Sequence, residues 1–234
     1  MIKNNDIRTT PKQRIIIAAI AVFMLASTFA LYAGIVLNAK NAASSDERVA
    51  TTQEEEDRFN ELYAEYQAQV DAQADELSNK YFGTFSQYKS RVKAFNQADV
   101  NEIKTNDLKV GTGATVTDSE FIDYAAYYIG WLKDGTIFDS SLDDDTNPTK
   151  LEVPLVGNAN MIEGWKQGIV GMKIGGIREI SIPSALAYGD TDNGTIPANS
   201  ALKFVVMLID PIEEIPVSDE LNHLYNKVIL GVDE

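Results

Sequence analysis

The side chains best suited to chemistry in this sequence are aromatic and apolar ones between residues 128 and 204. The set comprises Tyr128, Phe138, Asp139, Met161, Ile162, Trp165, Tyr188, Ile196, Pro197 and Phe204. Apart from the Asp139 carboxylate, its polar groups are hydroxyls and one indole N–H, so it can act by shape, desolvation and hydrogen bonding. The pattern predicts an apolar cage with aromatic walls.

Four short motifs join these positions in a fixed order. They are Asp134-Gly135-Thr136-Ile137-Phe138-Asp139-Ser140-Ser141, Ile162-Glu163-Gly164-Trp165-Lys166-Gln167-Gly168, Ile182-Pro183 and Ala187-Tyr188-Gly189. In order and spacing they resemble the FKBP-type peptidyl-prolyl cis-trans isomerases, the tacrolimus-binding family. The match covers residues 106–211 and implies an α+β fold, in which an antiparallel sheet wraps around a short helix.

The resemblance implies catalysis of rotation about the peptide bond that precedes proline. The barrier of about 18–20 kcal/mol comes from amide resonance, and the uncatalysed rotation takes roughly tens to hundreds of seconds. Because twisting decouples the nitrogen lone pair from the carbonyl, the transition state is less dipolar than either planar isomer. An apolar cage therefore favours the transition state, and neither a cofactor nor a metal is expected.

The resemblance also gives each residue a role. Trp165 would form the floor under the pyrrolidine ring. The backbone N–H of Ile162 and the hydroxyl of Tyr188 would hold substrate carbonyls, and Asp139 would polarise the pocket or bond the Tyr128 hydroxyl. The walls would come from Tyr128, Phe138, Met161, Ile162 and Phe204, and the flanking loop would carry Ile196 and Pro197.

Two loops depart from the family pattern. Residues 142–148 form an acidic loop, and the positions of an aromatic wall fall near Thr149 and Leu151, so we expect a thinner wall. A one-residue gap is needed between Tyr188 and Ile196, with Asn193-Gly194 at the loop tip. We expect activity to survive these changes, whereas drug affinity and sequence preference could shift.

Composition excludes several other classes of function. The formal net charge of −15 argues against a nucleic-acid partner, because phosphate binding needs a concentrated basic surface. The chain has no cysteine, and its single histidine, His223, lies away from every motif, so thiol and histidine chemistry are not expected. The run Asp143-Asp144-Asp145 lacks the ligand spacing of a calcium loop and predicts a solvated turn.

A run of 23 residues without charge extends from Ile15 to Leu37. At about 1.5 Å per residue it can cross a hydrocarbon core of about 30 Å, so we predict a transmembrane signal anchor at 15–37. Residues 1–14 are basic, which places them in the cytoplasm and the chain after about residue 40 outside the cell membrane. A cleaved signal peptide is the main alternative, but its apolar core is usually about 7–15 residues long. A buried helix of a soluble core is the other.

Residues 38–52 are small and polar and predict a linker, and residues 53–97 predict a helical stalk or hairpin. Apolar residues recur in steps of three and four at Phe59, Leu62, Tyr63, Tyr66, Val70, Ala74, Leu77 and Tyr81. Gly83 is expected to interrupt this helix, and Thr84 with Gln87 predicts a capping box for a second one, which carries Phe85, Tyr88, Val92 and Phe95. The aromatic stripe must be covered, either by the chain itself or by a second copy in a homodimer. Gly83 favours self-packing.

Residues 104–213 are expected to form the isomerase domain, with a helix from Ile162 to Val170. Strand-like runs occur at 108–110, 114–116, 124–129, 177–182 and 202–208. In the tail, 214–234, Ser218 is a good N-cap for an amphipathic helix that reaches Leu230. We expect this helix to dock on its own chain.

The sequence thus predicts a membrane-anchored isomerase that assists the folding of extracytoplasmic proteins and binds proline-containing polypeptides. Two other classes stay open. The chain could bind proline-containing peptides without turnover, or it could be a scaffold whose helices at 53–97 and 218–230 hold a partner. Retention of most of the cage favours the enzyme.

Overall fold

The computed structural model describes residues 52–117, 124–157 and 161–231. The predicted anchor at 15–37 and nearly all of the linker lie outside these residues. Among the residues that are described, no helix is long and apolar enough to cross a membrane. The chain divides into two compact units, Met1–Gln69 with Glu214–Glu234, and Val70–Glu213.

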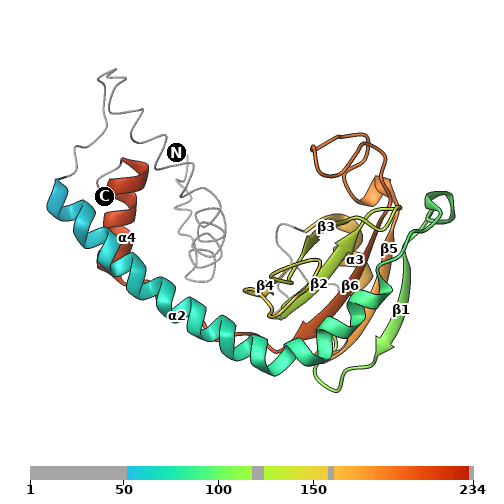
Figure 1. Ribbon diagram of the computed structural model, residues 1–234, viewed down its shortest axis with the longest axis horizontal. Coiled ribbons are helices and arrows are strands. Elements are labelled where there is room, and N and C mark those ends of the chain that lie inside the picture. The colour runs from blue at the N-terminus through green and yellow to red at the C-terminus, as the bar shows by residue number, and fades with distance from the viewer. Residues whose placement is uncertain (1–51, 118–123, 158–160, 232–234) are drawn as a thin grey trace, which may run out of the picture. The chain divides into compact units, whose positions relative to one another are not determined.

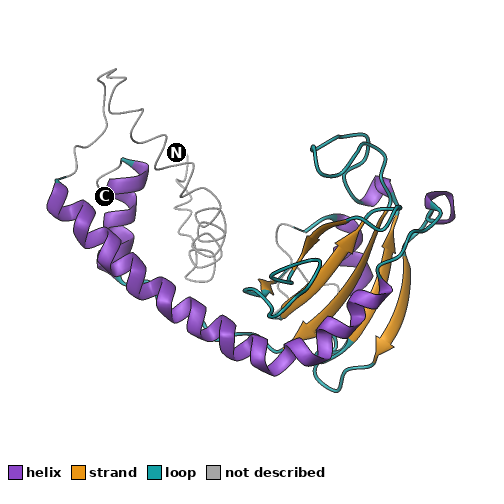
Figure 2. Cartoon of the chain, viewed as in Figure 1, coloured by secondary structure: helices purple, strands orange, loops and turns teal. Residues whose placement is uncertain are grey.

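The unit Val70–Glu213 contains an antiparallel sheet, as the sequence predicts. Its described strands are β1 (Lys104–Lys109), β2 (Ala125–Trp131), β3 (Ile137–Ser140), β4 (Leu155–Val156), β5 (Ile177–Ile182) and β6 (Leu202–Ile209). They lie in the order β1-β5-β6-β2-β3, and β4 pairs with one end of β2 (Figures 1 and 2). The sequence pattern did not single out β3 or β4, which are short and begin beside turns.

Both faces of this sheet are buried, and each face has its own apolar cluster. The helix α3 (Glu163–Ile169) packs on one face, where Phe204, Val206 and Leu208 of β6 meet it. The last turns of α2 (Gln53–Phe85) pack on the other face, against Val205, Met207 and Ile209. Because successive residues of a strand point to opposite faces, β6 supplies both clusters from one continuous apolar run.

Helix α2 continues through Gly83 to Phe85, so the predicted interruption at Gly83 is wrong. A glycine inside a helix costs about 1 kcal/mol, and burial of Phe85, which is fully enclosed against the sheet, outweighs that cost. The capping box is wrong too, since the Gln87 side chain donates to the Thr84 carbonyl at 2.8 Å. Two 3-10 turns, η1 (Ser86–Arg91) and η2 (Gln97–Asp99), follow in place of a second helix.

The second half of the aromatic stripe is covered by the chain's own sheet. Leu77, Tyr81, Phe82 and Phe85 belong to the cluster on that face, and Tyr127 of β2 lies with its ring centroid 6.1 Å from that of Tyr81. This agrees with the self-packing interpretation, and a second copy is not needed to cover these residues.

In the other unit, the start of α2 packs against the tail helix α4 (Asp219–Tyr225). Phe59 is buried with Leu221 and Leu224, and the Arg58 guanidinium bonds the Glu220 carboxylate at 2.8 Å. The Ser218 hydroxyl accepts from the Leu221 N–H at 3.1 Å, which confirms the predicted N-cap. The tail therefore docks on its own chain, although its last residues form the π-helical turn η4 (Asn226–Leu230).

Candidate functional site

The floor of the predicted cage is Trp165, which is fully buried on α3. Two glycines of the same helix allow this position. A Cβ at Gly164 would overlap the Ile182 side chain of β5, and one at Gly168 would lie 2.6 Å from Ile180. Because both positions lack a side chain, α3 lies directly on the strand, and the indole is held against the sheet.

The walls consist of aromatic rings that meet edge to face. The ring centroids of Tyr128 and Phe204 each lie 5.6 Å from that of Trp165, with interplanar angles of 85° and 88°. Phe138 meets Phe204 in the same way at 5.5 Å. Gly130 makes room for this pair, since a Cβ there would lie 2.7 Å from both rings. Edge-to-face contacts of this kind add to the gain from burial and fix the orientation of the rings.

The other predicted residues lie around the same cluster. Met161 and Ile162 are partly buried against it at the start of α3, and Ile196 is buried within it. Tyr188 stays 40% exposed. Within the described residues, neither the Tyr188 hydroxyl nor the Ile162 N–H has a hydrogen-bond partner, so both can donate to a substrate.

The carboxylate of the cage is Asp139, an exposed residue of β3 whose side chain accepts a hydrogen bond from the Tyr128 hydroxyl at 2.7 Å. Exclusion of water from part of its surface raises the pKa of Asp139, and the bond from Tyr128 opposes that rise. Burial and the nearby Asp139 carboxylate raise the pKa of Tyr188. The Tyr188 hydroxyl therefore stays neutral and able to donate near neutral pH.

The acidic loop is a turn held by its own carboxylates. Asp143 accepts from two backbone N–H groups at 2.8 and 3.1 Å, Asp144 from two at 2.6 and 2.7 Å, and Asp145 from a serine hydroxyl at 2.7 Å. Thr149 bonds the Asp143 side chain, and Leu151 is buried in the cluster on the α2 face. Neither adds an aromatic ring to the cluster around Trp165, which agrees with the thinner wall expected from the sequence.

Two residues that pattern reasoning missed support the cage. Gly130 could not be assigned a role from the sequence, because a glycine inside a strand indicates a bulge or a close approach but not which group approaches. Tyr124 lies two and four residues before Ala126 and Tyr128, on the same face of the sheet, and this period of two could have revealed it. Its hydroxyl accepts from the Trp165 indole N–H at 3.2 Å.

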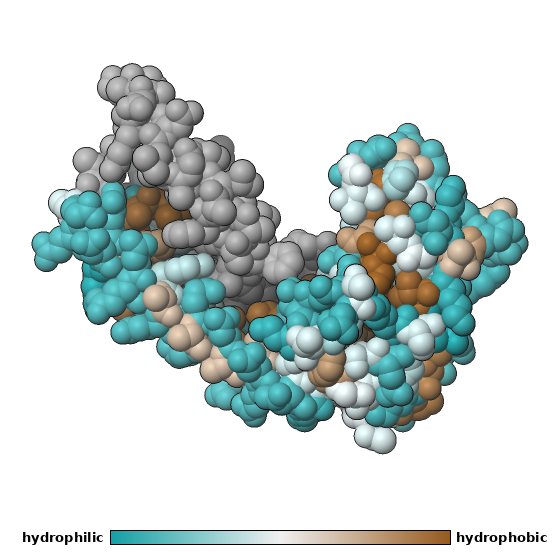
Figure 3. Space-filling view, in the orientation of Figure 1, coloured by the Kyte–Doolittle hydropathy of each residue, from teal (hydrophilic) through white to brown (hydrophobic). Residues whose placement is uncertain are grey.

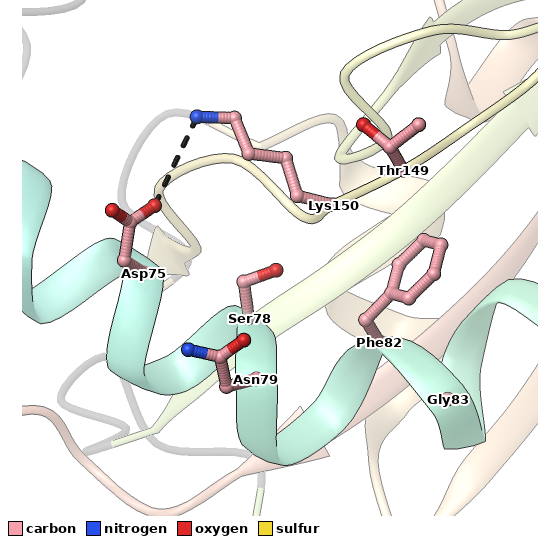
Figure 4. Close-up of a pocket in the computed structure, with 7 residues that line it drawn as sticks. All are labelled: Asp75, Ser78, Asn79, Phe82, Gly83, Thr149 and Lys150. Atoms are coloured by element: carbon pink, nitrogen blue, oxygen red, sulfur yellow. Dashed lines mark ion pairs between the residues drawn. The ribbon is translucent and has the colours of Figure 1, made fainter.

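Apolar side chains gather beneath the loop that joins β5 to β6, on the part of this unit that contains α3 (Figure 3). A polar recess of about 380 Å³ lies elsewhere, between α2 and residues 149–150 (Figure 4). Its residues include Ser78, whose hydroxyl accepts from the Leu151 N–H at 2.8 Å, and Lys150, which lies 3.9 Å from Asp75. None of the predicted cage residues lines it.

The sequence of residues 113–209 matches the family described as FKBP-type peptidyl-prolyl cis-trans isomerase. The FK506-binding protein of Neisseria meningitidis is 40% identical over 108 residues, which are 46% of this chain and 94% of that protein. The chain therefore belongs to the FKBP-type peptidyl-prolyl cis-trans isomerase family.

Other relatives are longer than the matched region. FK506-binding protein 4 of Chaetomium thermophilum is 37% identical over 114 residues, and the match spans 47% of this chain and only 22% of that protein. Among solved structures, the crystal structure of AtFKBP13 is 32% identical, with a TM-score of 0.37, over 47% of this chain and 93% of the other.

Proposed function

We propose that this chain is an active prolyl isomerase that acts on extracytoplasmic polypeptides. The observation that carries the proposal is the fully buried Trp165, which meets Tyr128 and Phe204 edge to face, with unpaired donors at Tyr188 and Ile162 among the described residues. A cage of this kind can remove the prolyl amide from water while leaving two N–H or O–H groups for its carbonyls.

The reaction follows from the physical chemistry of the amide. The pyrrolidine ring packs against Phe138 and Tyr128, over the cluster that Trp165 supports, where the less dipolar twisted amide is favoured over the planar one. The Tyr188 hydroxyl and the Ile162 N–H hold carbonyls on either side, which fixes one part of the chain while the other rotates. The bond from Tyr128 to Asp139 keeps that wall in place.

The test is the rate of cis-to-trans conversion of Leu-Pro and Glu-Pro peptides by the full chain in detergent micelles. We expect faster conversion of Leu-Pro, because Asp139 and the loop at 143–145 repel a carboxylate. The matched control is Phe138→Ala, which must lower the rate if the activity belongs to this cage and not to a contaminating host isomerase. No acceleration of either peptide would leave a binding module as the better interpretation.

We further propose that residues 15–37 anchor the chain in the cell membrane, with the catalytic unit outside. Support comes from the uncharged run of 23 residues and the basic residues before it. Protease added outside a cell with a permeable outer layer should remove the isomerase unit and leave a membrane-bound N-terminal fragment. A mature N-terminus near residue 43 would instead indicate a cleaved signal peptide.

A further inference from the structure

The indole N–H of Trp165 is a buried donor, and its partner decides how the ring sits. Trp165 is fully enclosed, so the N–H cannot reach bulk water and needs an acceptor inside the protein. The acceptor is the hydroxyl of Tyr124, at 3.2 Å. Tyr124 is itself only 1% exposed. The bond therefore lies behind the floor of the cage, where no substrate atom reaches.

Tyr124 is placed by the strand that also supplies a wall. It directly precedes β2, and its side chain points to the same face as Ala126 and Tyr128. Its backbone carbonyl accepts from the Gly157 N–H at 3.0 Å, which continues the pairing of β2 with β4. One strand thus supplies both the Tyr128 ring that meets the indole and the acceptor for its N–H.

The other ring contacts of Trp165 are apolar and do not hold the direction of its N–H. The glycines at 164 and 168 set the height of α3 over β5, and the edges of Tyr128 and Phe204 are apolar contacts at similar centroid distances. Edge-to-face contacts favour a tilt between two rings, whereas an N–H donor weakens steeply when its bond angle falls. The hydrogen bond therefore adds a restraint on the direction of the indole N–H.

We propose that Tyr124 is a positioning residue for the isomerase reaction, which orients the indole floor of the cage through its hydroxyl and touches no substrate. The inference rests on the proposed function and adds a residue to it. Burial raises the pKa of Tyr124 to about 12, while the bond from Trp165 acts in the opposite direction. The hydroxyl is therefore neutral at physiological pH, and its effect should not vary with pH there.

The test uses the indole N–H signals of the full chain, labelled with 15N-tryptophan in detergent micelles. The chain has two tryptophans, and Trp165→Phe assigns their signals. In Tyr124→Phe we expect the Trp165 signal to shift and its proton to exchange faster. The Trp131 signal should not move, because its N–H donates to the Lys93 carbonyl at 3.1 Å. The loss of one neutral hydrogen bond should lower kcat/KM by about two- to tenfold.

Tyr127→Phe is the matched control. Tyr127 is the next tyrosine along the chain and is equally buried. It points to the opposite face of the sheet, where its hydroxyl has no partner among the described residues. Removal of that hydroxyl should move neither indole signal and should leave kcat/KM unchanged. The comparison separates the loss of this particular bond from the loss of any buried phenol hydroxyl.

A double-mutant cycle distinguishes positioning from a general structural role. In a Trp165→Phe background the N–H is gone, so Tyr124→Phe should have no further effect on kcat/KM. An equal loss in both backgrounds would overturn the proposal, and so would an unchanged kcat/KM in Tyr124→Phe. Rapid exchange of the Trp165 indole proton in the unaltered chain would overturn it without any variant. An unaltered chain with no isomerase activity would refute the proposed function, and the positioning role with it.

Discussion

A methyl group added at Gly164 should disturb both stability and catalysis. An alanine Cβ there would overlap Ile182 and lie 3.0 Å from the Leu186 carbonyl oxygen. The Ile182 side chain is fully buried and cannot move aside, and the carbonyl belongs to the backbone. Overpacking of this kind costs about 1–3 kcal/mol, from which the better helix propensity of alanine recovers at most about 1 kcal/mol.

Gly83→Ala is the matched control for this prediction. Gly83 also lies in a helix, but a Cβ there would meet nothing within 4 Å. The control should gain about 0.5–1 kcal/mol from propensity alone, so the difference between the two variants isolates the packing cost at Gly164.

Thermal unfolding of the full chain, followed by circular dichroism, measures this difference. For a net loss of about 1–2 kcal/mol, Gly164→Ala should lower Tm by roughly 2–8 °C, and Gly83→Ala should raise it slightly. Because α3 must move away from β5, Trp165 moves with it, and kcat/KM should fall in Gly164→Ala only. An unchanged Tm together with full activity in Gly164→Ala would refute the argument that close packing of α3 positions the cage.

Phe138→Ala should lower kcat/KM more than Tyr188→Phe does. The first change removes a wall and its contact with Phe204, whereas the second removes one hydrogen bond worth about 0.5–1.5 kcal/mol. The reverse order, with both variants folded, would show that hydrogen bonding outweighs desolvation. Asp139 should make the free energy of unfolding depend on pH, because its pKa is raised in the folded state. An unfolded aspartate has a pKa of about 3.9. As pH rises from that value through the folded pKa, the folded state holds the proton more tightly than the unfolded state, so the free energy of unfolding should fall. Urea unfolding at several pH values should show this fall in the unaltered chain and a smaller one in Asp139→Asn; equal slopes would contradict it.

The sequence predicted the isomerase unit because its signals are local. A strand that is buried on both faces needs a continuous apolar run, and residues 204–209 have one. The turn at Asp134-Gly135 needs a residue with positive φ, and Gly135 has φ of 90°. The N-cap at Ser218 depends on two groups that are three residues apart, so the sequence could predict it as well. The family motif then brought the cage residues together in one prediction.

The errors arose where distant parts of the chain decide the outcome. The stop at Gly83 follows from propensity, but the sheet that buries Phe85 lies far along the sequence and keeps the helix intact. Leu151 follows the acidic loop, and no local pattern shows that it packs on the α2 face. Propensity differs by about 1 kcal/mol between residues, which burial of one large side chain can exceed.

The amino-acid sequence by itself indicated which residues gather around Trp165, since their types and order were sufficient to predict one apolar cluster. Tertiary structure alone decided how the cage is held: α3 lies on β5 through Gly164 and Gly168, and the Tyr124 hydroxyl orients Trp165. The physical reason is that residue type and spacing are local properties of the chain. Close packing and a buried hydrogen bond depend on atoms that are distant in the sequence, such as those of Tyr124 and Trp165, which are 41 residues apart. Only the fold brings such atoms into contact.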